Sequence, residues 1–134
     1  YVSKKHKEST YGIKTTRDGK IDQDILKEFG INYSEGLNRF KGNYKLYNDC
    51  LNKFLSKDRF SDLSKSIKED ELVKLLYKLY VLYDDASNLA LTTLASIVLK
   101  LIHTIQDNNE RDEDFIYSSN ELISTYSKLI DALK

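Results

Sequence analysis

The sequence predicts an all-α fold, and three observations support this prediction. The chain has 134 residues, of which none is proline and only five are glycine, so the residues that most damage a helix interior are scarce. Apolar residues recur at steps of three and four, which is the spacing of one buried helix face. Good capping residues precede several of these stripes. This length is enough for one hydrophobic core, and we expect a single domain with a tail.

The start of the chain differs in character from the rest. Residues 1–20 are polar and lack a helical stripe, and the pair Asp18-Gly19 is a turn signal. We interpret residues 1–20 as a linker or weakly ordered tail, and residues 21–134 as the helical domain. Tyr1 stands where an initiator methionine would, so we expect the domain to be part of a larger protein.

Two short helices are expected at the start of the domain. The first begins at Asp22, a favourable N-cap residue, and continues to Phe29. The second is marked by Asn32 and Glu35, which have the spacing of a capping box. Three glycines are interpreted as helix punctuation: Gly30, Gly36 and Gly42.

Longer helices follow, and their stripes predict the architecture. We expect a helix over residues 43–56, a central helix whose leucine stripe runs from Leu72 to Leu89, and two more over 92–106 and 112–133. Between the first two, residues 60–67 predict one or two further amphipathic turns. Short connections between long amphipathic helices imply an antiparallel four-helix bundle, with the initial short helices capping one end.

The central helix has apolar residues that its buried face does not account for. If the leucine stripe lies inside, other side chains occupy the opposite side and its flank: Tyr77, Val81, Asp84 and Asn88, with Val73 and Tyr80 beside them. Clustered exposed aromatic and branched side chains often mark a protein interface. The alternative interpretation is that the N-terminal tail or an extra helix covers the strip.

The same region carries a family resemblance. The segment Tyr80-Val81-Leu82-Tyr83-Asp84-Asp85-Ala86-Ser87-Asn88-Leu89 resembles the central-helix motif of histidine-phosphotransfer domains. In that motif a phosphorylated histidine is followed by leucine, lysine, glycine, small residues, asparagine and leucine. The following LALTTLASIVLKL and the earlier GINYSEGLNRFKGNYKLYNDCLNKFL also resemble the family, and the likeness covers about residues 25–134. It implies a four-helix bundle that docks the receiver domain of a response regulator or a hybrid kinase.

The departures from the motif fall where the family's chemistry resides. Tyr80 occupies the position of the phosphorylated histidine, and its phenol would hold a phosphate as a stable ester and could not relay it. Tyr83 replaces the lysine, so a cation that would neutralise the phosphoryl group is missing. Asp84 replaces the glycine and adds negative charge where the acidic pocket of a receiver would approach.

We therefore expect a degenerate phosphotransfer-like module, not an enzyme, that binds a receiver or kinase without passing phosphate. The candidate protein-binding surface comprises Val73, Tyr77, Tyr80, Val81, Tyr83, Asp84 and Asn88. Two alternatives stay open. The domain is a purely structural bundle or a homodimerisation module without a receiver partner, or phosphotransfer survives through another residue. His103, in the segment IHTIQ, is interpreted as a partly exposed structural histidine.

Composition argues against several other kinds of partner. The 21 basic and 21 acidic residues give no net charge, which argues against nucleic-acid binding. Cys50 is the only cysteine, so no internal disulfide can form and a reducing cytoplasm is expected. The longest apolar run, at residues 97–102, is interrupted by Lys100 and falls well short of the roughly 20 residues that span a bilayer. We expect no membrane contact.

No residue pattern predicts a metal ion or cofactor. The two histidines and single cysteine lack zinc-site spacing, and no glycine-rich phosphate loop occurs. In the acidic segment 107–114, Arg111 interrupts the ligand positions of a calcium loop and the glycine is absent. We interpret this segment as a solvated loop that leads into the last helix.

Overall fold

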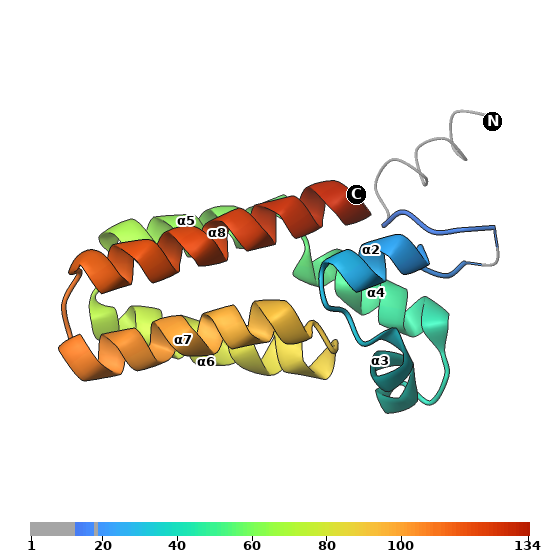
Figure 1. The fold of residues 1–134 in the computed structure, drawn as a ribbon, viewed down its shortest axis with the longest axis horizontal. Helices are drawn as coiled ribbons and strands as arrows, with labels where there is room; N and C mark the ends of the chain where they lie inside the picture. The colour runs from blue at the N-terminus through green and yellow to red at the C-terminus, as the bar shows by residue number, and fades with distance from the viewer. Residues whose placement is uncertain (1–12, 18) are drawn as a thin grey trace.

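The computed structural model describes residues 13–17 and 19–134, and this part of the chain is helical without strands. The all-α prediction is confirmed. Seven helices lie in this part: α2 (Gln23–Glu28), α3 (Tyr33–Arg39), α4 (Tyr44–Phe54), α5 (Lys57–Glu69), α6 (Leu72–Asn88), α7 (Thr92–Asn108) and α8 (Glu113–Leu133) (Figure 1). Most of the predicted tail, residues 1–12 and Asp18, lies outside the described residues. Where that tail is described, the Lys14 N–H donates to the Leu133 carbonyl at the end of α8.

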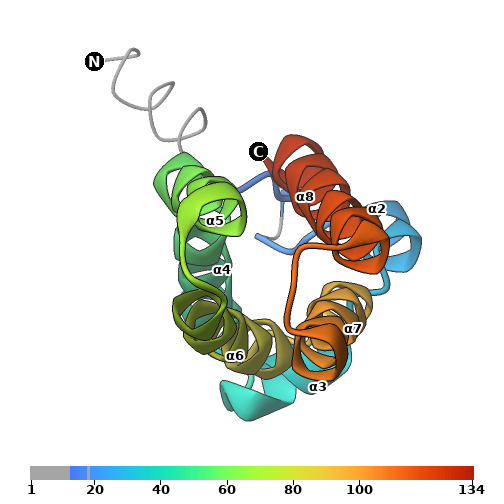
Figure 2. The same cartoon turned by 90° about the vertical axis from the view of Figure 1, so that its left-hand side faces the viewer.

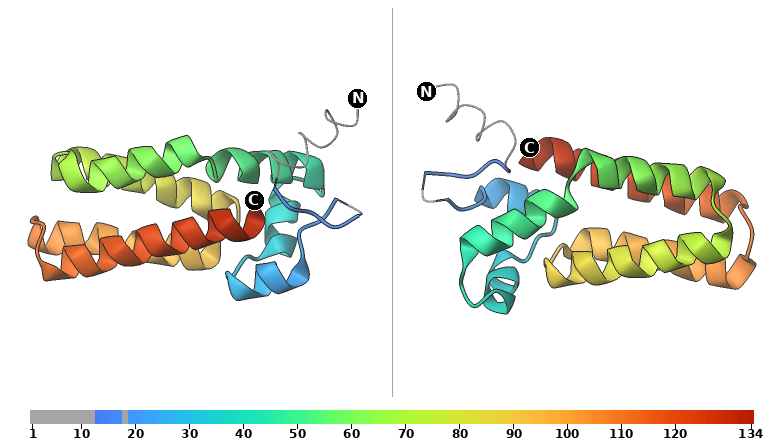
Figure 3. Two further views of the ribbon diagram at one scale, coloured as in Figure 1. Left: turned by 90° about the horizontal axis from the view of Figure 1, so that it is seen from above. Right: turned by 180° about the vertical axis from the view of Figure 1, so that it is seen from behind.

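The four helices α5, α6, α7 and α8 lie alongside one another (Figure 2). Each contacts the next in the chain, and α8 returns to contact α5. Helix α4 leads into α5 through a short connection and, seen from behind, slopes away from the line of α5 (Figure 3). Apolar residues of all these helices point inward, including Leu51, Leu75, Leu101 and Leu122, none of which is accessible to solvent.

The extent of α5 corrects the sequence prediction. We expected one or two turns over residues 60–67 and a long helix over 43–56 as the fourth member of the bundle. The structure instead ends α4 at Phe54 and starts a 13-residue helix after Ser56, whose side chain accepts the Arg59 N–H at 3.1 Å. Helix α5 is therefore the helix that contacts both α6 and α8, in place of the helix predicted over 43–56.

The predicted N-cap residues are confirmed. The side chain of Asp22 accepts the Asp24 N–H at 2.8 Å, and the side chain of Asn32 accepts the Glu35 N–H at 3.2 Å. The capping box at Asn32 is only half formed, however. Its own N–H donates to the Ala90 carbonyl, 2.9 Å away on the connection between α6 and α7, instead of to Glu35.

That hydrogen bond belongs to a set that fixes the short helices onto the turn between α6 and α7, at one end of the molecule as predicted (Figure 1). An isolated antiparallel bridge pairs Ile31 with Leu91. Around it, side chains bond to backbone carbonyls: Arg39 to Ser87, Tyr47 to Leu89 at 2.5 Å, and Thr92 to Gly30. Carbonyls that the end of a helix leaves unpaired are thus satisfied by residues far away in sequence.

The glycines play two different parts. Gly30 and Gly42 have φ of +61° and +79° and follow the ends of α2 and α3, so their interpretation as punctuation is confirmed. Gly36 was wrongly assigned to that group because it lies inside α3. A Cβ at Gly36 would lie 2.7 Å from the ring of Tyr47. Gly36 therefore lets α3 approach α4 closely enough for Tyr47 to reach the Leu89 carbonyl.

Two buried tyrosines anchor the core through their hydroxyl groups. Tyr47 donates to the Leu89 carbonyl, and Tyr126 donates to the Phe54 carbonyl at 2.5 Å. Neither side chain is accessible to solvent. Burial raises the pKa of Tyr126 to about 12 and raises the pKa of Tyr47 further, because a phenolate there would be poorly solvated.

The first prediction concerns the contact at Gly30. A Cβ there would lie 2.0 Å from the Thr93 hydroxyl and would also face a positive φ, whereas Gly42 has a positive φ but nothing within 4 Å. We expect Gly30→Ala to lower the free energy of unfolding by about 3 kcal/mol and Gly42→Ala by only about 1 kcal/mol. Urea denaturation of both variants measures the difference. Equal losses would contradict the close approach of Thr93.

The second prediction concerns alkaline pH. A tyrosine in an unfolded chain loses its proton near pH 10, whereas folded Tyr126 keeps its proton until about pH 12. Stability from this difference is complete below pH 10 and is lost as pH rises from 10 to 12, by up to about 1.4 kcal/mol per unit. We expect the free energy of unfolding of Tyr126→Phe to fall less steeply over this range than that of the unaltered chain. Identical slopes would show that Tyr126 does not contribute.

Candidate functional site

The strip that the sequence predicted on the outside of α6 is exposed. Val73 and Tyr77 have 76% and 73% of their surface accessible to solvent, and Tyr80 and Val81 have 44% and 42%. Asp84 and Asn88 are also exposed, while Tyr83 is partly buried. The opposite face of the helix is buried and consists of Leu75, Leu79, Leu82 and Ala86. Within the described residues, no helix or loop covers the strip. The sequence left open that the N-terminal tail covers it, and most of that tail lies outside the described residues.

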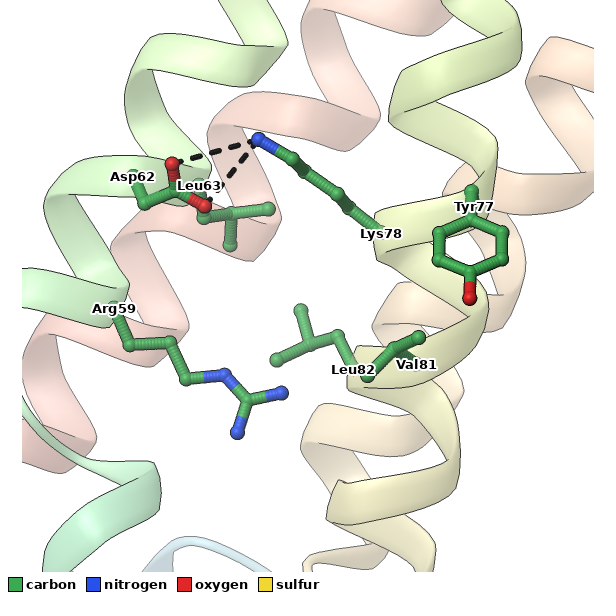
Figure 4. Close-up of a pocket in the computed structure, with 7 residues that line it drawn as sticks. All are labelled: Arg59, Asp62, Leu63, Tyr77, Lys78, Val81 and Leu82. Carbon is green, nitrogen blue, oxygen red and sulfur yellow. Dashed lines mark hydrogen bonds and ion pairs between the residues drawn. The ribbon is translucent and has the colours of Figure 1, made fainter.

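A groove between α5 and α6 borders this strip (Figure 4). It has a volume of about 260 Å³ and is lined by Arg59, Asp62, Leu63, Tyr77, Lys78, Val81 and Leu82. The side chains of Tyr77, Val81 and Leu82 come from α6, and Leu63 faces them from α5. The groove therefore presents mainly carbon surface to solvent, with charged groups at its margins.

A second groove of about 290 Å³ lies next to the first, toward α4. Its lining includes Phe40, Cys50, Lys53, Phe54, Arg59, Asp85, Asn88 and Leu89. Arg59 belongs to both grooves. Its Nη2 pairs with Asp85 Oδ2 at 2.6 Å, and its guanidinium lies 4.9 Å from the centre of the Phe54 ring. The Arg59–Asp85 pair thus forms a bridge from α5 to α6 between the two grooves.

Lys78 holds the other end of the first groove. Its Nζ donates to Ser66 Oγ at 2.6 Å and lies 3.4 Å from Asp62 and 3.3 Å from Asp70. Hydrogen bonds from Ser66 and Lys78 lower the pKa of Asp70. Desolvation opposes the charge on Lys78, but hydrogen bonds to Asp70 and Asp62 outweigh it and raise the pKa of Lys78. Lys78 and Asp70 therefore remain ionised at neutral pH.

Tyr80 points to the other flank of α6. Its hydroxyl accepts a hydrogen bond from the side-chain amide of Gln106 on α7. The partner of this phenol is therefore a neutral amide and not a cation. His103 is exposed on α7, one turn before Gln106. Tyr80 is thus on the surface, at the middle of α6, without an observed cationic partner in the described structure.

The structure therefore divides the predicted surface. Tyr77, Val81 and Asn88 line the α5–α6 grooves, whereas Tyr80 faces α7. Sequence reasoning missed the residues that complete the grooves: Arg59, Asp62, Leu63, Lys78 and Asp85. One signal was present, because Lys78 and Asp85 are seven residues apart and so lie on one side of a helix. Their partners on α5 could not be predicted, because the length of α5 was itself predicted too short.

The described residues bring together no group of three or more histidine, cysteine, aspartate or glutamate side chains that could hold a metal ion. None of their helices has the length and apolar character needed to cross a bilayer. In comparisons with known proteins, no family model, curated protein or solved structure matches the chain significantly.

The third prediction tests whether the side chains of the strip contribute to the stability of the fold. We expect Tyr77→Ala and Val81→Ala to change the free energy of unfolding by less than about 0.5 kcal/mol, because both side chains are exposed. The neighbouring Leu82→Ala should cost about 3 kcal/mol, because Leu82 is only 2% exposed. Urea denaturation compares the three. A large loss for Tyr77→Ala would mean that the strip is covered and structural.

Proposed function

We propose that the chain is a degenerate histidine-phosphotransfer-like signalling domain that binds a receiver domain or a kinase through the outward face of α6. It does not relay phosphate. The observation that carries the proposal is the exposed strip of Tyr77, Tyr80 and Val81 beside an open groove, on the helix whose sequence resembles the docking helix of that family. A strip of this size on a stable helix is typical of a protein interface.

The architecture is part of the proposal. A phosphotransfer domain is an antiparallel four-helix bundle, and α5, α6, α7 and α8 supply four neighbouring helices with short connections. In this assignment α6 and α7 form the central hairpin, and α2 and α3 close one end. The all-helical fold supports this assignment without distinguishing it from other helical bundles.

The chemistry of the strip favours docking over phosphate transfer. Tyr80 offers a phenol hydrogen-bonded to Gln106, where transfer requires an imidazole that accepts and returns a phosphoryl group. The cations nearest in sequence on α6, Lys74 and Lys78, precede Tyr80, and Lys78 is engaged with Asp62 and Asp70. Neither Tyr83 nor Asp84 supplies a positive charge in place of the missing lysine. An apolar contact surface remains, and apolar anchors dominate binding energy at interfaces.

Such a module would act by occupying the binding surface of a receiver. It would compete with active phosphotransfer domains for a receiver, or hold a receiver close to a kinase in the same assembly. Cytoplasmic location is part of this proposal, because the expected partners reside there. The alternative is a homodimer that uses the same strip as its seam, and it is favoured by the same exposed tyrosines.

The fourth prediction tests the proposed partner. Isotope-labelled domain is titrated with receiver domains from its own cell, and amide shifts are followed by NMR. We expect localised shifts at Val73, Tyr77, Val81 and Asp84, and loss of binding by at least about tenfold in Tyr77→Glu. The matched control is Tyr117→Glu on α8, since Tyr117 is also 66% exposed but lies on a different helix.

The outcomes separate the alternatives. If no receiver shifts these amides and sedimentation shows a dimer that Tyr77→Glu dissociates, the strip is a homodimer seam. The loss of relay chemistry is tested by incubating the chain with a phosphorylated receiver. Acid-labile phosphate on the unaltered chain would overturn the proposal. Acid-labile phosphate that appears only on the triple variant Tyr80→His, Tyr83→Lys, Asp84→Gly would support the proposal. It would mean that the unaltered chain still docks the receiver and lacks only the chemistry of transfer.

A further inference from the structure

One line of exposed residues along α6 has the spacing of a coiled coil. Five exposed side chains follow one another at alternating steps of three and four residues: Lys74, Tyr77, Val81, Asp84 and Asn88. This is the heptad spacing with which two helices pack along each other. These five residues, named the α6 seam below, therefore have the pattern that a second helix requires.

The charges of the α6 seam lie on either side of its apolar centre and have opposite signs. Lys74 lies in the first turn of α6 and Asp84 lies in the second half of the helix. Tyr77 and Val81 lie between them. Within residues 13–17 and 19–134, neither Lys74 nor Asp84 forms an ion pair.

The other charged groups of α6 are paired on its α5 side: Lys78 with Asp62 and Asp70, and Asp85 with Arg59. Lys74 is not part of these pairs. Hydrogen bonds from Ser66 and Lys78 lower the pKa of Asp70 most, and the charge of Lys74 contributes least. Lys74 and Asp84 therefore remain available for a partner.

Arg111, in the connection between α7 and α8, is likewise held within the chain. Its Nε donates to the Ile67 carbonyl at 2.9 Å, and its Nη2 donates to the Asp70 carbonyl at 2.5 Å at the end of α5. Its guanidinium also lies 5.5 Å from the centre of the Phe115 ring on α8. Arg111 therefore belongs to the contact between α5 and α8 and not to the α6 seam.

We propose that the α6 seam pairs in antiparallel orientation with the α6 seam of a second copy of the chain, with Tyr77 of each copy against Val81 of the other. Lys74 precedes Tyr77 by three residues, and Asp84 follows Val81 by three. The same register therefore places each Lys74 beside Asp84 of the other copy. Two-fold symmetry forms every such contact twice, because the two residues exchange roles between the copies.

Other arrangements of two α6 seams lose this complementarity. In a parallel pair with two-fold symmetry, Lys74 would face Lys74 and Asp84 would face Asp84, which brings like charges together. An antiparallel pair shifted by one heptad would set Val81 against Asp84, and a shift the other way would set Tyr77 against Lys74. Charge and apolar contact thus select one register.

The distribution of charge over the two ends of the molecule also favours antiparallel pairing. Segments 68–74 and 107–114 lie at the end where α6 begins, and they contain eight acidic and three basic residues (Figure 1). Residues 33–56, which form α3 and α4 at the opposite end, contain two acidic and four basic residues. Antiparallel pairing brings ends of unlike charge together, whereas parallel pairing brings like ends together.

Self-pairing would regulate the proposed docking, and this consequence rests on the proposed function. The dimer would cover Tyr77 and Val81, which are the side chains proposed to bind a receiver or kinase. A receiver would then bind only the free chain. By mass action, a high local concentration of the chain would withdraw it from receiver binding.

The experiment is sedimentation equilibrium of the chain of 134 residues at concentrations up to about 1 mM. We expect a dimer that added salt weakens. Lys74→Glu and Asp84→Lys should each raise the dimer Kd at least about tenfold, because each change brings like charges together twice. The matched controls are Lys128→Glu and Asp131→Lys, which alter exposed residues of α8 and should leave the Kd unchanged.

Charge reversal tests the register. A mixture of Lys74→Glu chains and Asp84→Lys chains should form a heterodimer, and a chain with both substitutions should again form a homodimer, because opposite charges then meet. Both residues are exposed, so these variants are expected to fold. A chain that stays monomeric at about 1 mM, single substitutions without effect, or failure of the double variant to restore the dimer would each overturn the inference.

Receiver binding is measured separately, at concentrations at which the chain is a monomer. If the dimer and its charge rescue are observed and no receiver binds, the proposed function fails and the self-pairing stands. If a receiver binds the dimer as tightly as it binds the monomer, the regulatory role of self-pairing is overturned.

Discussion

The contact between the N-terminal short helices and the turn joining α6 to α7 is the interaction on which the rest of the structure depends. Ala90 follows the C-cap of α6 with a φ of +57°, and the Leu91 N–H donates to the Ala86 carbonyl at 2.9 Å. A left-handed alanine is costly, by about 1 kcal/mol or more. Carbonyls of this turn accept hydrogen bonds from Asn32, Arg39 and Tyr47, and these bonds hold the turn in its conformation.

This contact also positions the candidate site. With the α6–α7 turn fixed against α3 and α4, the side of α6 that carries Lys78 and Asp85 meets α5, and the side that carries Tyr80 meets α7. The strip between these two sides faces outward. Its apolar character has no role in the core, because Leu75, Leu79 and Leu82 already supply the buried face. The candidate site therefore consists of exposed apolar side chains on a helix whose opposite face is already packed in the core.

Features that depend on residues close together in the sequence could be predicted, and features that depend on distant residues could not. The N-caps at Asp22 and Asn32 and the exposure of Tyr77 and Val81 depend on spacing within one helix, and all were predicted correctly. The length of α5 was predicted too short, because Phe60, Leu63 and Ile67 are the only apolar residues that mark a stripe in this largely polar helix.

Contacts between helices were beyond sequence reasoning. The fit of Gly36 against Tyr47 and the Arg59–Asp85 bridge depend on the register of two helices, and a single sequence does not encode that register in any local pattern. The same limit applies to both groove linings, since each combines side chains from segments distant in sequence. Hydrophobic periodicity identifies the buried side of each helix but not its neighbour across the interface.

The tether of Arg111 to the end of α5 has a kinetic consequence. Helix pairs α6–α7 and α7–α8 are adjacent in sequence and should form early, whereas Arg111 reaches the carbonyl of Ile67 across 44 residues. Closure of α8 onto α5 must therefore wait until both pairs have formed. Contacts absent from the folding transition state act on the unfolding rate. Contacts of Arg111 would then slow the unfolding of the α5–α8 pair and have little influence on the folding rate.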